Sequence, residues 1–199
     1  MKESIQKVKD NKEKQQTYTI QMRKYKRAIK EDFHIEAICI CYAMCEDRLV
    51  SFLYHSGCIN RELKVTKKYN KSIRKIWLLK NSDKYNLNNI SSKYNYILRM
   101  LEWSQLEHKD ENEFETSLKK KIIGEVDIEE LQNIIKNLNI WCNERNQIVH
   151  ALLNKNVDEL GAKSQTLAED GYEIARALDN IVKVYKKKNN IRKKLGIQG

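Results

Sequence analysis

Three residues near position 145 combine side chains that act together on phosphate esters. The chain there reads Asn143-Glu144-Arg145-Asn146-Gln147-Ile148-Val149-His150. Arginine binds phosphate through two parallel N–H donors, and its charge persists in the transition state. Histidine exchanges protons near neutral pH, and asparagine donates to a phosphate oxygen or orients the imidazole. Arg145, Asn146 and His150 are therefore the candidate catalytic residues.

An apolar helix is expected around these residues, with Arg145 on its buried face. Alternating spacings of three and four residues connect the apolar positions, namely Ile128, Leu131, Ile135, Leu138, Cys142, Val149 and Leu152. A buried charge is costly unless it is paired. Arg145 should therefore meet a buried carboxylate, face a subunit interface or line a polar cleft; a purely structural ion pair is the alternative. Glu46, which interrupts the apolar stripe of residues 32–55, is the candidate partner, unless it lies at the stripe edge and reaches water.

The spacing Arg145-Asn146-x3-His150 resembles the motif of the HEPN family of helical ribonucleases. That motif places a histidine four to six residues after an arginine, often with a polar residue directly after the arginine. The pairs Arg27–His34 and Arg48–His55 match the looser spacing, but an apolar residue follows each arginine. The resemblance implies an all-α, HEPN-like antiparallel bundle of about five helices. It also implies a metal-independent endoribonuclease without a cofactor, in a toxin or phage-defence role that allows for a regulatory protein partner.

Metal-independent RNA cleavage uses the ribose 2′-hydroxyl as the nucleophile and needs both a base and an acid. One chain supplies one histidine at this motif. On an ideal helix Arg145 and His150 point about 140° apart, whereas Asn146 and His150 share a face. A two-fold homodimer through this helix would bring two copies of each residue to one cleft. We therefore expect a composite site between two copies of the chain, with RNA as the substrate.

The composition favours long helices joined by short polar links. The chain of 199 residues has no proline and six glycines, with 41% hydrophobic and 33% charged residues. Residues 1–16 are expected to be unstructured, 81–89 to be a loop, and 109–126 to be a charged, exposed connection. The predicted helices cover residues 18–30, 32–55, 66–80, 91–108, 127–153 and 158–188. Gly57 should end the second helix in a left-handed conformation.

Positive charge gathers at the two ends of the sequence. Residues 1–30 hold ten Lys and Arg against three acids, residues 183–199 hold seven and no acids, and the total of +11 leaves the remainder at −3. We therefore divide the chain into a basic, partly helical extension (1–30), a bundle (31–188) and a basic tail (189–199). Basic arms attract nucleic acid, although a lysine-rich composition with merely solvated ends is an equal alternative. The candidate nucleic-acid-binding residues are Lys24, Lys26, Arg27, Lys186, Lys187, Lys188, Arg192, Lys193 and Lys194.

Several classes of protein are not expected from this sequence. No apolar run is long enough to span a membrane, and residues 1–30 lack the apolar core of a signal peptide. The five cysteines suggest a reduced, cytoplasmic protein, and their spacing does not predict a metal site. Two alternatives to the nuclease remain. One is a non-catalytic helical module that binds RNA or protein, and the other is an antitoxin-like structural dimer with Arg145 in an interface ion pair.

Overall fold

Eight α-helices and one short 3-10 helix form the part of the chain that the structure describes. The structure is a computed structural model, and it describes residues 11–152 and 156–197. Within those ranges there is no β-strand, which confirms the all-α prediction, but the helices are more numerous than the five or so expected. They are α1 (Asn11–Lys30), α2 (His34–His55), α3 (Asn70–Ile76), α4 (Ile90–Gln105), α5 (Glu113–Glu125), α6 (Ile128–Ala151), α7 (Val157–Tyr185) and α8 (Ile191–Lys194), with the 3-10 helix at Lys67–Tyr69 before α3.

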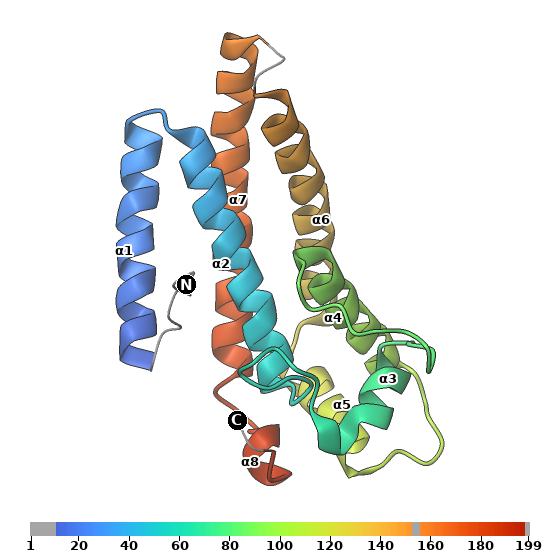
Figure 1. The fold of residues 1–199 in the computed structure, drawn as a ribbon. Helices are drawn as coiled ribbons and strands as arrows, with labels where there is room; N and C mark the ends of the chain where they lie inside the picture. Colours follow the sequence, from blue (N-terminus) through green and yellow to red (C-terminus); the bar gives the residue numbers. More distant parts are fainter. Residues whose placement is uncertain (1–10, 153–155, 198–199) are drawn as a thin grey trace, which may run out of the picture.

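The long helices α2 and α7 form the centre of the bundle, where they make its most extensive interhelical contact. Helices α1 and α6 lie on opposite sides of this pair, α1 against α2 and α6 against α7 (Figure 1). Helix α4 packs between α2 and α6, and the short helices α3, α5 and α8 gather at the end of the bundle where α2 and α7 finish (Figure 1). The two ends of α6 therefore differ: its first residues meet the packed end, and its last residues lie at the other.

Residues 109–126 contain a helix where an exposed connection was expected. Asn112 caps α5, since its side chain accepts hydrogen bonds from the backbone N–H groups of Phe114 and Glu115. Phe114, Leu118 and Ile122 follow at four-residue spacing and are fully buried. The prediction was wrong because three apolar residues among many charged ones are enough to bury one narrow face of a helix.

Both ends of the described chain are more ordered than predicted. Residues 11–16 belong to α1 rather than to an unstructured segment, and residues 1–10 lie outside the described part. Tyr25 and Ala28 of α1 are buried, so α1 is a full member of the bundle. At the other end, Ile191, Leu195 and Ile197 are buried, and α8 packs on α5. Residues 191–197, expected to be a basic tail, therefore extend the core.

The remaining helix limits agree with the pattern to within a few residues. Helix α3 is shorter than predicted, because the chain leaves the helical conformation after Ile76. Gly57 adopts a positive φ of 76° directly after the capping residue of α2, as expected for a left-handed stop. Of the helices described, none is both long and apolar enough to cross a bilayer. Four cysteines are buried and Cys39 is exposed, all as free thiols.

Candidate functional site

Helix α6 carries the motif, and its first half is fixed by its cap and its apolar seam. The Asp127 side chain accepts a hydrogen bond from the backbone N–H of Glu130 at 2.9 Å, as the sequence predicted. Leu131, Ile135 and Leu138 of the predicted seam are buried. The cap and these buried residues therefore fix the rotation of α6, and with it the direction in which the motif residues point.

Trp141 fixes the second half of α6 against α7. Its indole N–H donates a hydrogen bond to the carbonyl oxygen of Leu167 at 2.7 Å. The ring lies over Gly171, so closely that a Cβ atom there would come within 2.6 Å of it. Glycine is required at position 171 because the Trp141 ring occupies the volume of a side chain. Arg145 follows Trp141 by one helical turn on the same helix.

The seam departs from the prediction after Cys142. Ile148 is buried instead of Val149, which is half-buried, and Leu152 is 41% exposed. Positions 141 and 148 are seven residues apart and lie on one face of α6, and the large indole of Trp141 packs this face against α7. The end of α6 therefore leaves apolar area of Val149 and Leu152 uncovered beside the motif.

Arg145 is half-buried between α6 and α2. Its guanidinium lies over the Tyr42 ring, 4.8 Å from the ring centre, and its Nη1 donates to the side-chain oxygen of Asn146 at 3.0 Å. Its Nε is buried and has no hydrogen-bond partner. Among the described residues no carboxylate forms an ion pair with it, and its guanidinium contacts an aromatic face and an amide oxygen.

Glu46 does not pair with Arg145. Its carboxylate accepts a hydrogen bond from the ammonium of Lys93 at 2.6 Å, and that lysine is almost completely buried. The expectation was wrong because sequence spacing showed Glu46 near the buried face but could not show that α4 places Lys93 opposite it. The hydroxyl of Tyr42 is influenced by both Glu46 and Arg145. Burial and the negative charge of Glu46 raise its pKa, and the positive charge of Arg145 lowers it.

Asn146 and His150 are exposed on the end of α6. They are four residues apart and share a helix face, as expected. In the described part of the chain no hydrogen bond or ion pair joins His150 to Arg145. A single copy of the chain therefore offers a half-buried arginine with Asn146 beside it, and a separate, solvent-accessible histidine.

The two looser arginine–histidine pairs lie elsewhere. Arg27 is exposed and pairs with Glu31. Arg48 is buried: it contacts Asp47, pairs with Asp179 of α7 at 2.9 Å, and lies over the Tyr18 ring of α1. Arg48 thus joins three helices.

A second candidate site is a groove that α1, α2 and α7 form together, here called the basic groove. Its volume is about 1070 Å³. His55 and Arg48 lie in its α2 wall, seven residues apart and so on one face. The lysines and arginines that line it are Lys14, Arg23, Lys26, Arg48, Arg176, Lys183, Lys186 and Lys187.

The basic groove brings together part of the predicted nucleic-acid-binding set. Of the nine predicted residues, Lys26, Lys186 and Lys187 line it. Lys24, Arg27, Lys188, Arg192, Lys193 and Lys194 do not line it. Arg192 in particular is buried over the Tyr54 ring and donates to the carbonyl oxygen of Ile59 at 2.8 Å, so it is structural.

Sequence reasoning missed the remaining cations of the basic groove. These are Lys14, Arg23, Arg48, Arg176 and Lys183. Arg176 and Lys183 are seven residues apart, and the predicted Lys187 follows four residues later, which is the spacing of one helix face. This spacing was present in the sequence, but the predicted residues were chosen from short runs of Lys and Arg near the chain ends. Apart from the neighbours Lys186 and Lys187, the cations of the groove recur at the spacing of a helix face rather than in consecutive runs along the sequence.

His55 has an unusual environment in this groove. Burial, together with the positive charges of Lys186, Lys121, Arg192 and Lys14, lowers its pKa from 6.5 to about 4. Its imidazole is therefore neutral at physiological pH. A neutral histidine among lysines is consistent with strongly positive potential in the basic groove.

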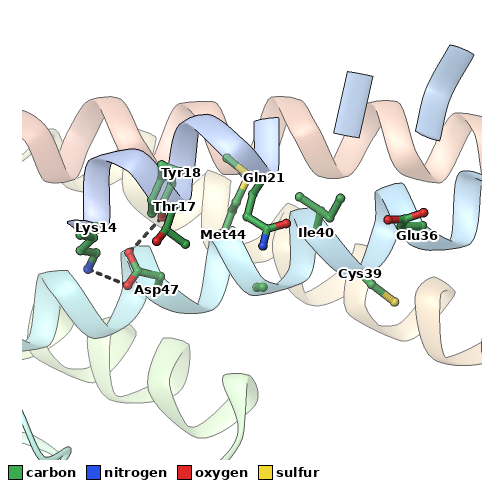
Figure 2. Close-up of a pocket in the computed structure, with 10 residues that line it drawn as sticks. Lys14, Thr17, Tyr18, Gln21, Glu36, Cys39, Ile40, Met44 and Asp47 are labelled. Atoms are coloured by element: carbon green, nitrogen blue, oxygen red, sulfur yellow. Dashed lines mark hydrogen bonds and ion pairs between the residues drawn. The ribbon is translucent and has the colours of Figure 1, made fainter. Parts of the chain in front are cut away.

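A smaller crevice of about 390 Å³ adjoins the basic groove between α1 and α2. Figure 2 shows Lys14 and Tyr18 converging on Asp47 at one end of it, with ion-pair and hydrogen-bond distances of 2.7 Å and 2.9 Å. Ile40, Met44 and Cys39 of α2 line the rest. No group of three or more His, Cys, Asp or Glu side chains that could hold a metal ion occurs there or elsewhere in the described ranges.

Comparison of the chain with protein-family models, with curated proteins and with solved structures finds no match.

Proposed function

We propose that the chain is a metal-independent endoribonuclease of the HEPN type, acting on RNA in the cytoplasm through Arg145, Asn146 and His150. The observation that carries this proposal is the state of Arg145. It is half-buried, lies on Tyr42, contacts Asn146, and has no carboxylate partner in the described part of the chain. A guanidinium held in place without a counter-charge is suited to a phosphate, which would supply the missing negative charge.

The reaction proceeds by attack of the ribose 2′-oxygen on the adjacent phosphorus. A base removes the 2′-hydroxyl proton, the new P–O bond forms, and an acid protonates the departing 5′-oxygen. The products carry a 2′,3′-cyclic phosphate and a 5′-hydroxyl group. Arg145 stabilises the charge on the pentacoordinate phosphorus, Asn146 donates to a phosphate oxygen or orients His150, and His150 transfers protons.

A homodimer would complete the site. The reaction needs a base and an acid, and His150 of one chain is not hydrogen-bonded to its own Arg145. A two-fold contact through the end of α6 would bring two His150 and two Arg145 to one cleft. The exposed apolar area of Leu152 and the half-buried Val149 would be covered by such a contact. This is the second part of the proposal.

The direct test is cleavage of labelled single-stranded RNA in the presence of EDTA. The wild type should produce 2′,3′-cyclic phosphate ends. Arg145→Ala and His150→Ala should each lower the rate by about 10²-fold or more, the usual effect of removing a charge-stabilising or proton-transferring group. Arg61→Ala, which changes an exposed arginine far from α6 in sequence, is the matched control. Equal rates for all four proteins, or cleavage that requires a metal ion, would exclude this function.

The composite site has its own test. Sedimentation at micromolar concentration should show a dimer, and Leu152→Lys should dissociate it and reduce cleavage together, because the substitution places like charges across the two-fold axis. A fully active monomer would contradict the composite site while leaving the nuclease proposal intact. A toxin or phage-defence role, which the resemblance implies, predicts that expression of the wild type arrests growth and that Arg145→Ala does not.

A non-catalytic RNA-binding module is the second candidate, and the basic groove favours it. RNA binding without cleavage by the wild type would support this candidate. A protein that neither binds nor cleaves RNA would favour the antitoxin-like structural dimer.

A further inference from the structure

We propose that the basic groove between α1, α2 and α7 is a second RNA-binding site, which holds the phosphate backbone of a single strand away from the α6 motif. The groove and the motif lie on different sides of the α2–α7 pair, because α1 flanks one side and α6 the other (Figure 1). The groove itself is recognised from its charge and shape. The choice of RNA among phosphate polymers rests on the proposed nuclease function.

The charge of the groove is only partly neutralised from within the protein. Four of its eight cations have carboxylate partners: Asp47 pairs with Lys14 and Arg48, Asp179 with Arg48 and Lys183, and Glu173 with Arg176. The other four are Arg23, Lys26, Lys186 and Lys187, and no carboxylate among the described residues pairs with them.

The four unneutralised cations come from both ends of the sequence. Arg23 and Lys26 lie on α1, whereas Lys186 and Lys187 directly follow the end of α7. Like charges that line a concave surface focus a positive potential, which raises the local concentration of an anionic ligand and costs stability when no ligand is bound. A row of phosphates would relieve this repulsion.

The position of these residues is fixed by contacts between other side chains of the bundle rather than by the four unneutralised charges themselves. The Tyr25 ring of α1 stacks on the Tyr172 ring of α7 with centres 4.9 Å apart. Arg48 connects α2 to α7 through Asp179 and to α1 through the face of Tyr18. The groove is thus a feature of the packed bundle that exists before any ligand arrives.

The lining of the groove favours an extended strand. Its volume of about 1070 Å³ is near the upper end of the range of roughly 300–1,000 Å³ found for small-molecule pockets, so the side chains that line it decide between ligand classes. Tyr18, Met22, Met44 and Tyr172 give it apolar and aromatic surface among the cations. Single-strand binders combine these two properties, because the cations follow the backbone while apolar surface contacts bases and riboses. An acidic peptide would use the charges but would leave the aromatic surface without a matching partner.

Binding in the groove would raise the local concentration of RNA near the motif without contributing to the chemistry. A substrate held at one site and cleaved at another gains effective concentration at the second. Changes in the groove should therefore alter the affinity for RNA and leave the rate at saturating RNA almost unchanged.

The test is fluorescence anisotropy with a labelled 2′-O-methyl oligouridine, which lacks the nucleophile and cannot be cleaved by the proposed reaction. One variant replaces Arg23, Lys26, Lys186 and Lys187 by Gln. The control replaces Lys71, Lys84, Lys109 and Lys120, four exposed lysines outside the groove, so that both proteins lose the same charge. The two halves, Arg23→Gln/Lys26→Gln and Lys186→Gln/Lys187→Gln, are measured as well, in case the fourfold variant does not fold.

The groove variant should bind at least about tenfold more weakly than the control. Its plot of log affinity against log salt should also be shallower, by about 0.7 for each lost phosphate contact. Equal losses in variant and control would mean that the charge acts diffusely, which overturns the proposal. Competition by polyglutamate as strong as by oligouridine, or tighter binding of anionic vesicles or duplex RNA, would also overturn it. Because the probe is not cleaved, these outcomes are independent of whether Arg145 and His150 are catalytic.

Discussion

The guanidinium of Arg145 lies 4.8 Å from the centre of the Tyr42 ring, and the carboxylate of Glu46, one turn further along the same helix as Tyr42, binds Lys93 instead. The helix that was expected to supply a counter-ion to Arg145 supplies an aromatic face. The face holds the cation in place without neutralising it, which leaves its charge available to an anion such as a phosphate.

Tyr42 should therefore act as a positioning residue for Arg145. Tyr42→Leu removes the aromatic face and should lower cleavage by about tenfold, since a partly desolvated cation–π contact contributes roughly 1–2 kcal/mol. Tyr42→Phe keeps the ring and should retain most of the activity. The measurement is kcat and KM for both variants. Equal activity of the leucine and phenylalanine variants would show that the ring does not position the arginine.

Gly171 and Gly161 form a matched pair on α7. Gly171→Ala places a methyl group against the Trp141 ring, at 2.6 Å before relaxation, and should destabilise the protein by about 1–3 kcal/mol, as overpacking does. Gly161→Ala meets no atom within 4 Å and should stabilise the helix by up to about 1 kcal/mol, because alanine has the higher helix propensity. Urea denaturation of both variants measures this difference. A stabilised Gly171→Ala protein would mean that Trp141 is not packed there.

Lys121 should be the most sensitive of the buried charges. It is 2% exposed, pairs with Glu125 at 2.7 Å, and donates to the carbonyl oxygens of Tyr185, the last residue of α7, and of Lys188 beyond it. Lys121→Met leaves Glu125 buried without its cation and should cost about 3–5 kcal/mol of unfolding free energy. Adding Glu125→Gln should restore part of the loss. Lys120→Met, at an exposed neighbouring position, should change the free energy of unfolding by less than about 0.5 kcal/mol.

His55 should make the protein less stable in mild acid. Its pKa in the folded protein is about 4, against 6.5 without the fold, so the unfolded chain binds the additional proton between these values. Stability is therefore full above pH 6.5 and falls as the pH drops toward 4. The loss is at most about 3 kcal/mol and is reduced by solvent screening, because the side chain is partly exposed.

The difference in unfolding free energy between the wild type and His55→Gln at several pH values isolates this effect from other groups, including Asp47, whose pKa is also lowered. A difference that does not depend on pH would contradict the prediction. An oligouridine bound in the basic groove should raise the pKa of His55, which NMR titration of its imidazole can follow, since a nearby phosphate favours the imidazolium.

The parts of the fold that were predicted from sequence are those with dense apolar periodicity. Helices α2 and α6 were found within a few residues because their buried positions recur every three or four residues, and the cap at Asp127 was recognised from local chemistry. Helix α5 was missed because Phe114, Leu118 and Ile122 stand among many charges. Helix α8 was missed because its four residues are held by tertiary contacts, which a propensity argument does not include.

The candidate site was predicted only in part, again because sequence spacing shows local neighbours and not tertiary contacts. The motif residues Arg145, Asn146 and His150 are close in sequence, so they could be found without a fold. The partner of Glu46 could not, because Lys93 lies 47 residues further along the chain. The basic groove joins residues from α1 and α7, and only their packing on α2 shows that charges from the two chain ends line one groove.

Helix α7 serves both candidate sites within a short stretch of sequence. Gly171 accommodates Trp141 of the motif helix, whereas Tyr172 and Arg176 belong to the basic groove. Inserting or deleting one residue between Gly171 and Lys183 would rotate the groove cations by about 100° relative to the Trp141 contact. After such a length change, either the Trp141 contact or the basic groove could keep its geometry, but not both. This segment should therefore tolerate substitutions on its solvent side but no change in length, and natural or engineered length variation should be confined to the loops.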